Sequence, residues 1–106
     1  MKPHPSNNDI SAIEFKEKLS QGASVHLLDV REEIEFHTFN LGGKNIPLGK
    51  LALSLEELDD IKNDEIVVIC QRGIRSETAR RLLVSAGFKH VKNLTGGLLA
   101  LRKITT

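Results

Sequence analysis

The residues of this chain that could do covalent chemistry are concentrated between Cys70 and Ser76. Cys70 is the only cysteine, and the six residues after it include a glycine and two arginines. A thiol reacts as its thiolate, whose formation is favoured by nearby arginines and by a helix N-terminus. Arg72 and Arg75 supply positive charge, and Gly73 allows the loop amides to form a nest for an anion. This stretch therefore predicts a site for a thiolate, a cysteine persulfide (Cys–S–S⁻) or an incoming sulfur oxyanion.

Other roles for Cys70 require neighbours that the chain supplies only in part. Most strand cysteines are buried structural residues, but the arginines, the glycine and the helix start beside Cys70 argue against that role. A cysteine phosphatase needs a longer cradle, with its arginine at the sixth position after the cysteine; here that position is Ser76, and Arg75 comes one residue early. A thioredoxin-like dithiol is excluded because there is no second cysteine.

The four histidines of the chain offer no clear catalytic or metal-binding pattern. A Cys–His protease would need a histidine close to Cys70 in space, and nothing in the sequence marks one. Their spacing also does not match a metal-ligand motif, so neither a metal nor another cofactor is predicted. These residues are His4, His26, His37 and His90.

Length and composition indicate one ordinary globular domain. The chain has 106 residues, a hydrophobic fraction of 40% and a net charge of +1. This balance argues against nucleic-acid binding and against a membrane surface, both of which usually need a basic excess. No apolar run reaches the ~20 residues that span a bilayer. We expect a flexible tail over residues 1–9 and a domain over residues 10–106. A single cysteine fits a reducing compartment, so a cytoplasmic protein is predicted.

Strands and helices are expected to alternate along the chain. The apolar run before Cys70 is typical of a buried strand, and an apolar stripe from Ala79 to Ala86 predicts a helix after the loop. The expected strands cover residues 25–30, 44–46, 66–70 and 91–94. The expected helices follow Ser11, Val30, Leu53, the Cys70 loop and Gly97. Such alternation predicts an α/β fold with a parallel sheet and helices on both faces.

Two helix starts carry the sequence of a capping box, in which a serine and a glutamate three residues later bond each other's backbone amides. The first is Ser11 with Glu14, and the second is Ser54 with Glu57. Each is flanked by the residue pair of a hydrophobic staple, Ile10 with Phe15 and Leu53 with Leu58. In parallel sheets the site lies outside the carboxyl ends of the strands. We therefore expect Asp29, Arg31 and Cys70 to meet on one rim.

Three segments together resemble the rhodanese-like family of single-domain sulfurtransferases, over residues 10–103. Residues 29–36, Asp-Val-Arg-Glu-Glu-Ile-Glu-Phe, resemble the family's D-x-R-x-x-x-E-aromatic motif. Residues 70–76, Cys-Gln-Arg-Gly-Ile-Arg-Ser, resemble its active loop, C-x-x-G-x-R-S. Residues 93–100 resemble its last strand, glycine turn and helix.

The resemblance implies a five-stranded, mostly parallel sheet and a persulfide mechanism. Cys70 would be catalytic and would take a sulfane sulfur from an anionic donor such as thiosulfate. It would then pass the sulfur to cyanide, to a thiol or to a protein. The loop length is that of the sulfurtransferases, since the family's phosphatases have one residue more. The implied persulfide- or substrate-binding residues are Gln71, Arg72, Gly73, Ile74, Arg75 and Ser76, and the implied structural residues near the site are Asp29, Arg31 and Glu35.

The cysteine count adds an inference of its own. Without a second cysteine, the chain cannot discharge a Cys70 persulfide by forming an internal disulfide. The acceptor must therefore be another molecule: cyanide, a small thiol or a protein. The alternative function is a persulfide carrier that docks on one protein partner and turns over small molecules poorly. An exposed apolar patch near Cys70 would favour that alternative. A monomer is expected in either case.

Overall fold

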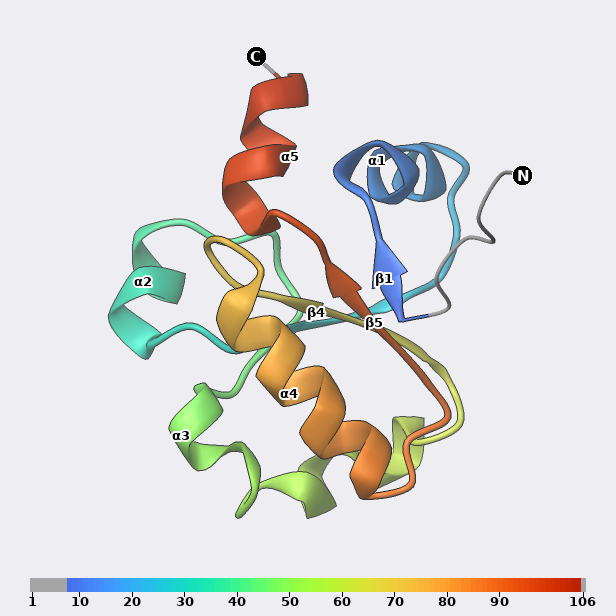
Figure 1. The fold of residues 1–106 in the computed structure, drawn as a ribbon, viewed down its shortest axis with the longest axis vertical. Helices are drawn as coiled ribbons and strands as arrows, with labels where there is room; N and C mark the ends of the chain where they lie inside the picture. Colours follow the sequence, from blue (N-terminus) through green and yellow to red (C-terminus); the bar gives the residue numbers. More distant parts are fainter. Residues whose placement is uncertain (1–7, 106) are drawn as a thin grey trace, which may run out of the picture.

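The computed structural model describes residues 8–105, which surround a five-stranded sheet (Figure 1). Its strand order is β1-β5-β4-β2-β3, and every neighbouring pair is parallel. The predicted α/β class with a parallel sheet is confirmed. The strands are β1 (Asp9–Ile10), β2 (His26–Asp29), β3 (Lys44–Asn45), β4 (Glu65–Ile69) and β5 (His90–Leu94).

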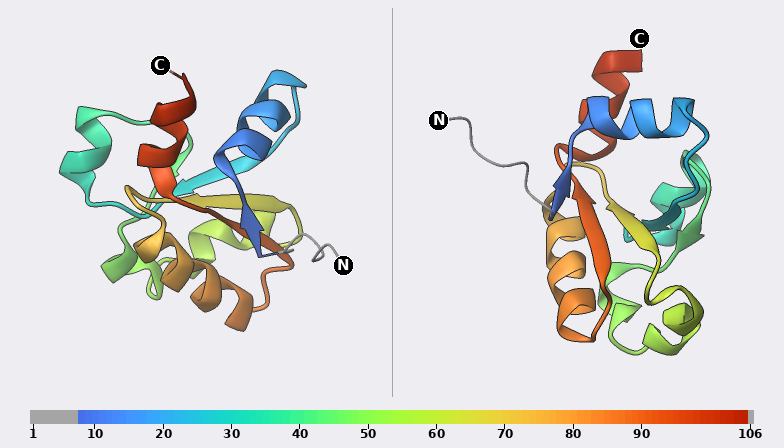
Figure 2. Two further views of the ribbon diagram at one scale, coloured as in Figure 1. Left: turned by 45° about the horizontal axis from the view of Figure 1, so that its top comes forward. Right: turned by 90° about the vertical axis from the view of Figure 1, so that its right-hand side faces the viewer.

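The helices cover both faces of the sheet, as the sequence predicts. They are α1 (Ala12–Ser20), α2 (Glu33–Thr38), α3 (Leu48–Leu51), the 3₁₀ helix η1 (Leu55–Ile61), α4 (Ile74–Ser85) and α5 (Gly97–Thr105). Helices α1 and α5 lie on one face, and α3, η1 and α4 lie on the other (Figures 1 and 2). None of the described helices is long and apolar enough to cross a membrane.

The central strand, β4, and the cysteine that follows it supply side chains to both halves of the core. Ile66, Val68 and Cys70 belong to the apolar cluster on the α4 side. Val67 and Ile69 belong to the cluster that contains α1 and α5. Because successive strand residues face opposite sides, a strand covered on both faces must be apolar throughout. This explains the uninterrupted apolar run that precedes the cysteine.

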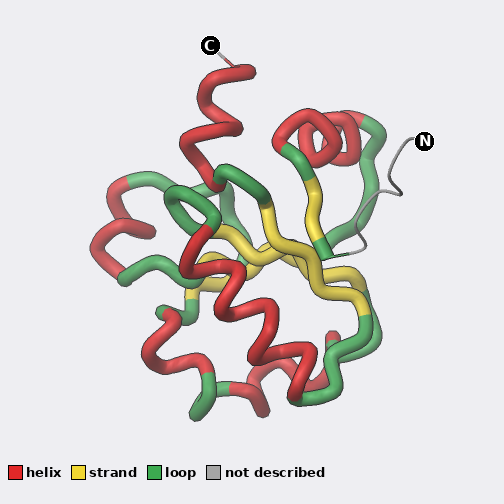
Figure 3. Tube along the Cα trace, viewed as in Figure 1, coloured by secondary structure: helices red, strands yellow, loops and turns green. Residues whose placement is uncertain are grey.

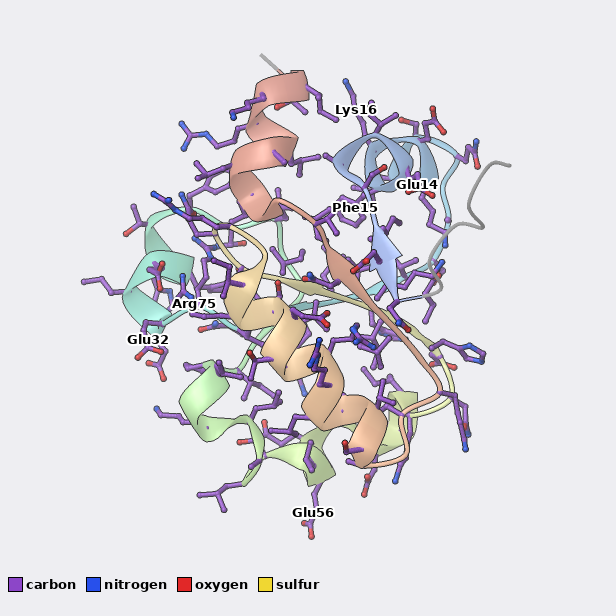
Figure 4. All side chains as sticks on the ribbon, viewed as in Figure 1. Glu14, Phe15, Lys16, Glu32, Glu56 and Arg75 are labelled. Atoms are coloured by element: carbon purple, nitrogen blue, oxygen red, sulfur yellow. The ribbon has the colours of Figure 1, made fainter. Side chains whose placement is uncertain are left out.

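Helix α1 begins as its sequence predicts. The Ser11 hydroxyl accepts a hydrogen bond from the Glu14 amide at 3.1 Å, and the Glu14 carboxylate accepts one from the Ser11 amide at 3.0 Å. The Ser11–Glu14 capping box is therefore confirmed. Ile10 and Phe15 are buried in the same apolar cluster, and Phe15 extends from α1 toward the sheet (Figure 4).

The prediction of a second capping box, at Ser54 and Glu57, is wrong, and the segment after Ser54 is a 3₁₀ helix. The Ser54 hydroxyl donates to the Lys50 carbonyl instead of receiving an amide bond. Leu53 is 94% exposed while Leu58 is buried, so the expected staple does not form either. The cause is the short helix α3, which the sequence did not predict. The Ser54 amide donates to the carbonyl of Leu51, the last residue of α3. Ser54 therefore ends the turn of α3 and does not cap η1.

Strand β1 was not predicted, because two residues carry no periodic pattern. Asp9 and Ile10 pair with Asn93 and Leu94 of β5 and form one edge of the sheet (Figure 3). The sequence placed Asp9 in the flexible tail, whereas the structure places it in the sheet. Residues 1–7 of that tail lie outside the described residues.

Candidate active site

Cys70 follows the last residue of β4, at the carboxyl end of the sheet, and the loop after it leads into α4. Gly73 is the N-terminal cap of α4 and has φ of +91°, a left-handed conformation that favours glycine. A Cβ atom at this position would also lie 2.9 Å from the Gly96 amide nitrogen. The glycine of the loop is therefore required by its conformation and by the close approach of the turn after β5.

The Cys70 sulfur is buried and surrounded by hydrogen-bond donors. The Gly73 amide donates to Sγ at 3.0 Å and the Ser76 amide at 3.3 Å, and the Ser76 hydroxyl oxygen lies 3.2 Å from Sγ. Burial by itself raises the pKa of the Cys70 thiol. The hydrogen bonds from Ser76, Gly73 and the Arg72 amide outweigh burial and hold that pKa below its ordinary value. The loop is thus built to favour a sulfur anion.

A pocket of about 310 Å³ opens over the loop, lined by Cys70, Gln71, Arg72, Ile74 and Arg75. Five of the seven residues predicted for the loop line this pocket. The other two, Gly73 and Ser76, do not line it, and their amides donate to the Cys70 sulfur. The Arg72 side chain is exposed at the rim. The structure thus brings the whole predicted loop together around one sulfur atom.

The N-terminus of α5 holds the loop from the other side. The Leu98 amide donates to the Cys70 carbonyl at 3.0 Å, and the Leu99 amide donates to the Gln71 carbonyl at 3.1 Å. A Cβ at Gly97 would lie 2.5 Å from both carbonyl oxygens, so the approach requires glycine. The first two carbonyls of the loop are therefore bound by α5, while the amides of Gly73 and Ser76 face the sulfur. The sequence predicted a turn at the two glycines but not this contact.

Asn93 of β5 is a site residue that the sequence analysis missed. Its side-chain nitrogen donates to the Gly73 carbonyl at 3.1 Å, and its oxygen accepts a short hydrogen bond from the Ser76 hydroxyl. Asn93 is 5% exposed and is buried together with Val91 and Leu94 of the same strand. Asparagine is depleted in strands. The signal that could have revealed it is its place as the first residue of the third family-like segment, at a strand position where a polar amide is unusual.

The predicted residues Asp29, Arg31 and Glu35 form a chain of ion pairs and hydrogen bonds that ends on the loop. Arg31 donates to both oxygens of the Asp29 carboxylate, at 2.7–3.1 Å, and both side chains are almost fully buried. Arg31 also donates to the carbonyls of Glu35 and Phe39. The Glu35 carboxylate accepts two hydrogen bonds from Arg75, at 2.7 and 3.0 Å. The Arg75 side chain extends from the start of α4 toward α2, and Glu32 lies nearby (Figure 4).

The Glu35–Arg75 pair makes a pH-dependent contribution to stability. The two hydrogen bonds from Arg75 outweigh desolvation and lower the pKa of Glu35 from 4.5 to about 2. A lowered carboxyl pKa stabilises the fold above the unfolded pKa, and this contribution is lost as the pH falls from about 4.5 to about 2. Because both side chains are about one-third exposed, solvent screening limits it to about 1 kcal/mol or less.

We therefore expect Glu35→Gln to be slightly less stable than the wild type at pH 7, with the difference shrinking as the pH falls below about 4.5 and gone near pH 2. Urea unfolding followed by circular dichroism at several pH values measures this difference. Glu33→Gln, whose side-chain pair with Lys50 is more exposed, is the control and should show a smaller effect. A stability difference that persists unchanged to pH 2 would contradict the assignment.

Among residues 8–105, no histidine forms a hydrogen bond with the Cys70 sulfur. His26 pairs with Asp64 at the start of β2, and His90 begins β5, so both lie at the opposite end of the sheet from Cys70. His37 makes an edge contact with Phe36, and His4 lies outside the described residues. Within the described part of the chain, no group of three acidic, histidine or cysteine side chains could hold a metal ion.

Comparisons of this sequence with known proteins agree on one family. The family model for the rhodanese-like domain matches residues 11–103. The chain is 40% identical over 101 residues to YrkF of Bacillus subtilis, named as a candidate sulfur carrier protein; the match covers 90% of the chain and 54% of YrkF. The chain thus spans about half the length of that relative. It is 36% identical over 93 residues to YtwF of Bacillus subtilis, named as a candidate sulfurtransferase, with 87% of each covered.

Solved structures agree with the sequence matches. The human single-domain sulfurtransferase TSTD1 is 26% identical and superposes with a TM-score of 0.77, covering 90% of this chain and 95% of that protein. The family model covers nearly the whole domain, and the loop around Cys70 carries the residues of the C-x-x-G-x-R-S motif. The chain therefore belongs to the rhodanese-like family of sulfurtransferases and sulfur carriers.

Proposed function

We propose that this chain is a sulfurtransferase that carries sulfane sulfur on Cys70. The observation that supports this most directly is the buried Cys70 sulfur, with two amide donors aimed at it beneath a small pocket. In the first step the Cys70 thiolate attacks the outer sulfur of thiosulfate. The S–S bond of thiosulfate breaks, sulfite leaves with the bonding electrons, and Cys70 becomes a persulfide anion. This step needs no external oxidant.

In the second step a nucleophile takes the outer sulfur from the persulfide. Cyanide or an external thiolate attacks that sulfur, the Cys70 S–S bond breaks, and its electrons return to Cys70 as thiolate. The amides of Gly73 and Ser76 stabilise this leaving thiolate. Arg72, exposed at the rim, attracts the anionic donor, whereas the charge of Arg75 is shared with Glu35. We further propose a monomer acting in the cytoplasm, where a lone thiol stays reduced.

A mass measurement tests this function. The protein is incubated with thiosulfate and desalted, and its intact mass is measured before and after addition of cyanide. The proposal expects an increase of one sulfur atom, then its loss with release of an equal amount of thiocyanate. No adduct with thiosulfate or with any other sulfane donor would contradict the function.

The exposed apolar side chains near the pocket favour a second function, that of a persulfide carrier that docks on a protein. Ile74 lines the Cys70 pocket and is 73% exposed. An adjoining pocket contains Ile34, which is 78% exposed, and Phe39, which is 50% exposed. Gln71 lines both pockets, which therefore adjoin, and we refer to Ile34, Phe39 and Ile74 around them as the apolar patch. Exposed apolar patches of this kind are typical of protein-binding surfaces.

If the patch binds acceptors, the loaded protein should transfer sulfur faster to a cysteine peptide flanked by leucines than to one flanked by glycines. Burying one large side chain on Ile34 is worth about a tenfold preference. Ile34→Ser should remove that preference and leave transfer to cyanide unchanged. Leu53→Ser is the control, because Leu53 is more exposed and lines neither pocket. Equal rates for both peptides with the wild type would exclude this function of the patch.

A further inference from the structure

The Asn93 side chain determines where the Ser76 hydroxyl donates its proton. The Gly73 carbonyl can only accept, so the Asn93 nitrogen, 3.1 Å away, must be the atom that faces it. The Asn93 oxygen then faces Ser76, and an amide oxygen has no proton to give. Ser76 has a single hydroxyl proton. With Asn93 in this orientation, that proton goes to Asn93.

This arrangement has a consequence for Cys70, which lies on the other side of Ser76. Its sulfur is 3.2 Å from the Ser76 hydroxyl oxygen, which presents a lone pair as long as its proton stays on Asn93. A lone pair suits the Cys70 thiol, whose S–H can donate to it. It opposes the thiolate. After Cys70 loses its proton to solvent, the hydroxyl must rotate toward the sulfur, and the Asn93 oxygen loses its donor.

Burial makes this competition costly to resolve. Cys70 is 1% exposed, Ser76 is fully buried and Asn93 is 5% exposed, so water does not readily replace a missing hydrogen bond. A buried acceptor left without its donor costs as much as a typical hydrogen bond or more. The Asn93 oxygen and the Cys70 thiolate therefore compete for the single hydroxyl proton of Ser76.

We propose that Asn93 is a positioning residue that restrains the ionisation of Cys70 by competing with its sulfur for the Ser76 hydroxyl. Through its nitrogen, Asn93 also anchors Gly73, whose amide donates to the same sulfur. The two contacts thus act in opposite directions on the thiolate. In a persulfide the inner sulfur is uncharged and does not require the hydroxyl. The competition consequently disfavours the free thiolate and not the loaded cysteine.

The charged groups around the pocket set a background that Asn93 does not alter. They are Arg72 and Arg75 on the loop and α4, Glu35 on α2, and Arg31 and Arg102, which line the adjoining pocket with Glu35. Asn93 is neutral, so replacing it by another neutral residue leaves these charges in place. A change of Cys70 ionisation that depends on both Asn93 and Ser76 can then be assigned to the hydroxyl.

A double-mutant cycle tests the proposal. The rate of Cys70 alkylation by iodoacetamide is measured against pH for the wild type, Asn93→Leu, Ser76→Ala and the double variant. Loss of the Gly73 anchor changes the ionisation constant equally in both backgrounds, whereas release of the hydroxyl acts only when Ser76 is present. We expect Asn93→Leu to favour ionisation about tenfold more with Ser76 present than in the Ser76→Ala background. Equal effects in both backgrounds, or a coupling of the opposite sign, would overturn the proposal.

The controls separate this effect from damage to the fold. Asn45→Leu removes another strand amide, one that donates to the carbonyls of Asp29 and Arg31, and it should not change the alkylation profile. If Asn93→Leu does not fold, Asn93→Ala takes its place in the same cycle, because it adds no bulk to the site. The inference rests on Cys70 as the reactive thiol of the proposed function. Since alkylation needs no sulfur donor, failed sulfur transfer and failed coupling are distinguishable.

Discussion

Cys70→Ser is expected to leave the protein folded and unable to take up sulfur from thiosulfate. The serine hydroxyl would occupy the place of the thiol and meet the same neighbours, the amides of Gly73 and Ser76 and the Ser76 hydroxyl, so no buried polar group loses its partner. A hydroxyl at its free pKa is a weak nucleophile, and this site has no base to activate it among the contacts of residues 8–105. Sulfur uptake should therefore fall to the background level of the assay.

The single cysteine makes this experiment easy to interpret. No other thiol of the chain can carry the sulfur, so intact mass alone reports the occupancy of Cys70. The circular dichroism spectrum and the midpoint of urea unfolding should stay close to those of the wild type. A sulfur adduct on folded Cys70→Ser would place the reactive group elsewhere and refute the proposed mechanism. Thiocyanate release by the variant at the wild-type rate would refute it as well.

Arg31→Ala is expected to cause the largest loss of stability among single substitutions near the site. Asp29 and Arg31 are 2% and 4% exposed and bind each other through three side-chain hydrogen bonds. Removal of the guanidinium leaves a buried carboxylate without its counter-charge, which costs about 3–5 kcal/mol. It also removes the donors to the carbonyls of Glu35 and Phe39, so the segment that holds Arg75 loses its support. The melting temperature should fall by about 15 °C or more.

Urea unfolding measures this loss, and circular dichroism is the suitable probe because the chain contains neither tryptophan nor tyrosine. Arg81→Ala is the matched control. Arg81 also pairs with a carboxylate, that of Glu77, but its side chain is 75% exposed. Its loss should cost only about 0.5 kcal/mol. The double variant Asp29→Asn with Arg31→Met should recover part of the stability, since it leaves no unpaired buried charge. Equal losses for Arg31→Ala and Arg81→Ala would show that burial does not strengthen the Asp29–Arg31 contribution.

Much of the fold follows from local sequence patterns. The apolar run of β4, the capping box at Ser11 and the apolar stripe of α4 are all where the sequence predicts them. The predictions fail where a local pattern competes with its surroundings. Ser54 has the residues of a capping box, but the preceding turn at α3 occupies its backbone and hydroxyl. Strand β1 is too short to show a period, and it exists because β5 offers it an unpaired edge.

The same contrast holds for the candidate site. Cys70, the loop to Ser76 and the Asp29–Arg31–Glu35 segment are recognisable by residue type and spacing. Their arrangement agrees with the expectation that strand ends gather on one rim. The role of Arg75 is more specific than predicted, because its charge is shared with Glu35 from α2. Spacing along the chain cannot show this pair, since 40 residues separate its members.

By itself, the sequence determined the chemistry available to this protein: one thiol, a loop rich in amide donors and positive charge, and no second cysteine to discharge a persulfide. These features depend on residue type and on short spacing, which the backbone converts directly into local geometry. The tertiary structure alone decided which groups control that thiol. Asn93 reaches Ser76 and Gly73 from β5, and the amides of α5 bind the carbonyls of Cys70 and Gln71. These contacts join residues that are 17 or more positions apart, because parallel strands bring their carboxyl ends to the same edge of the sheet.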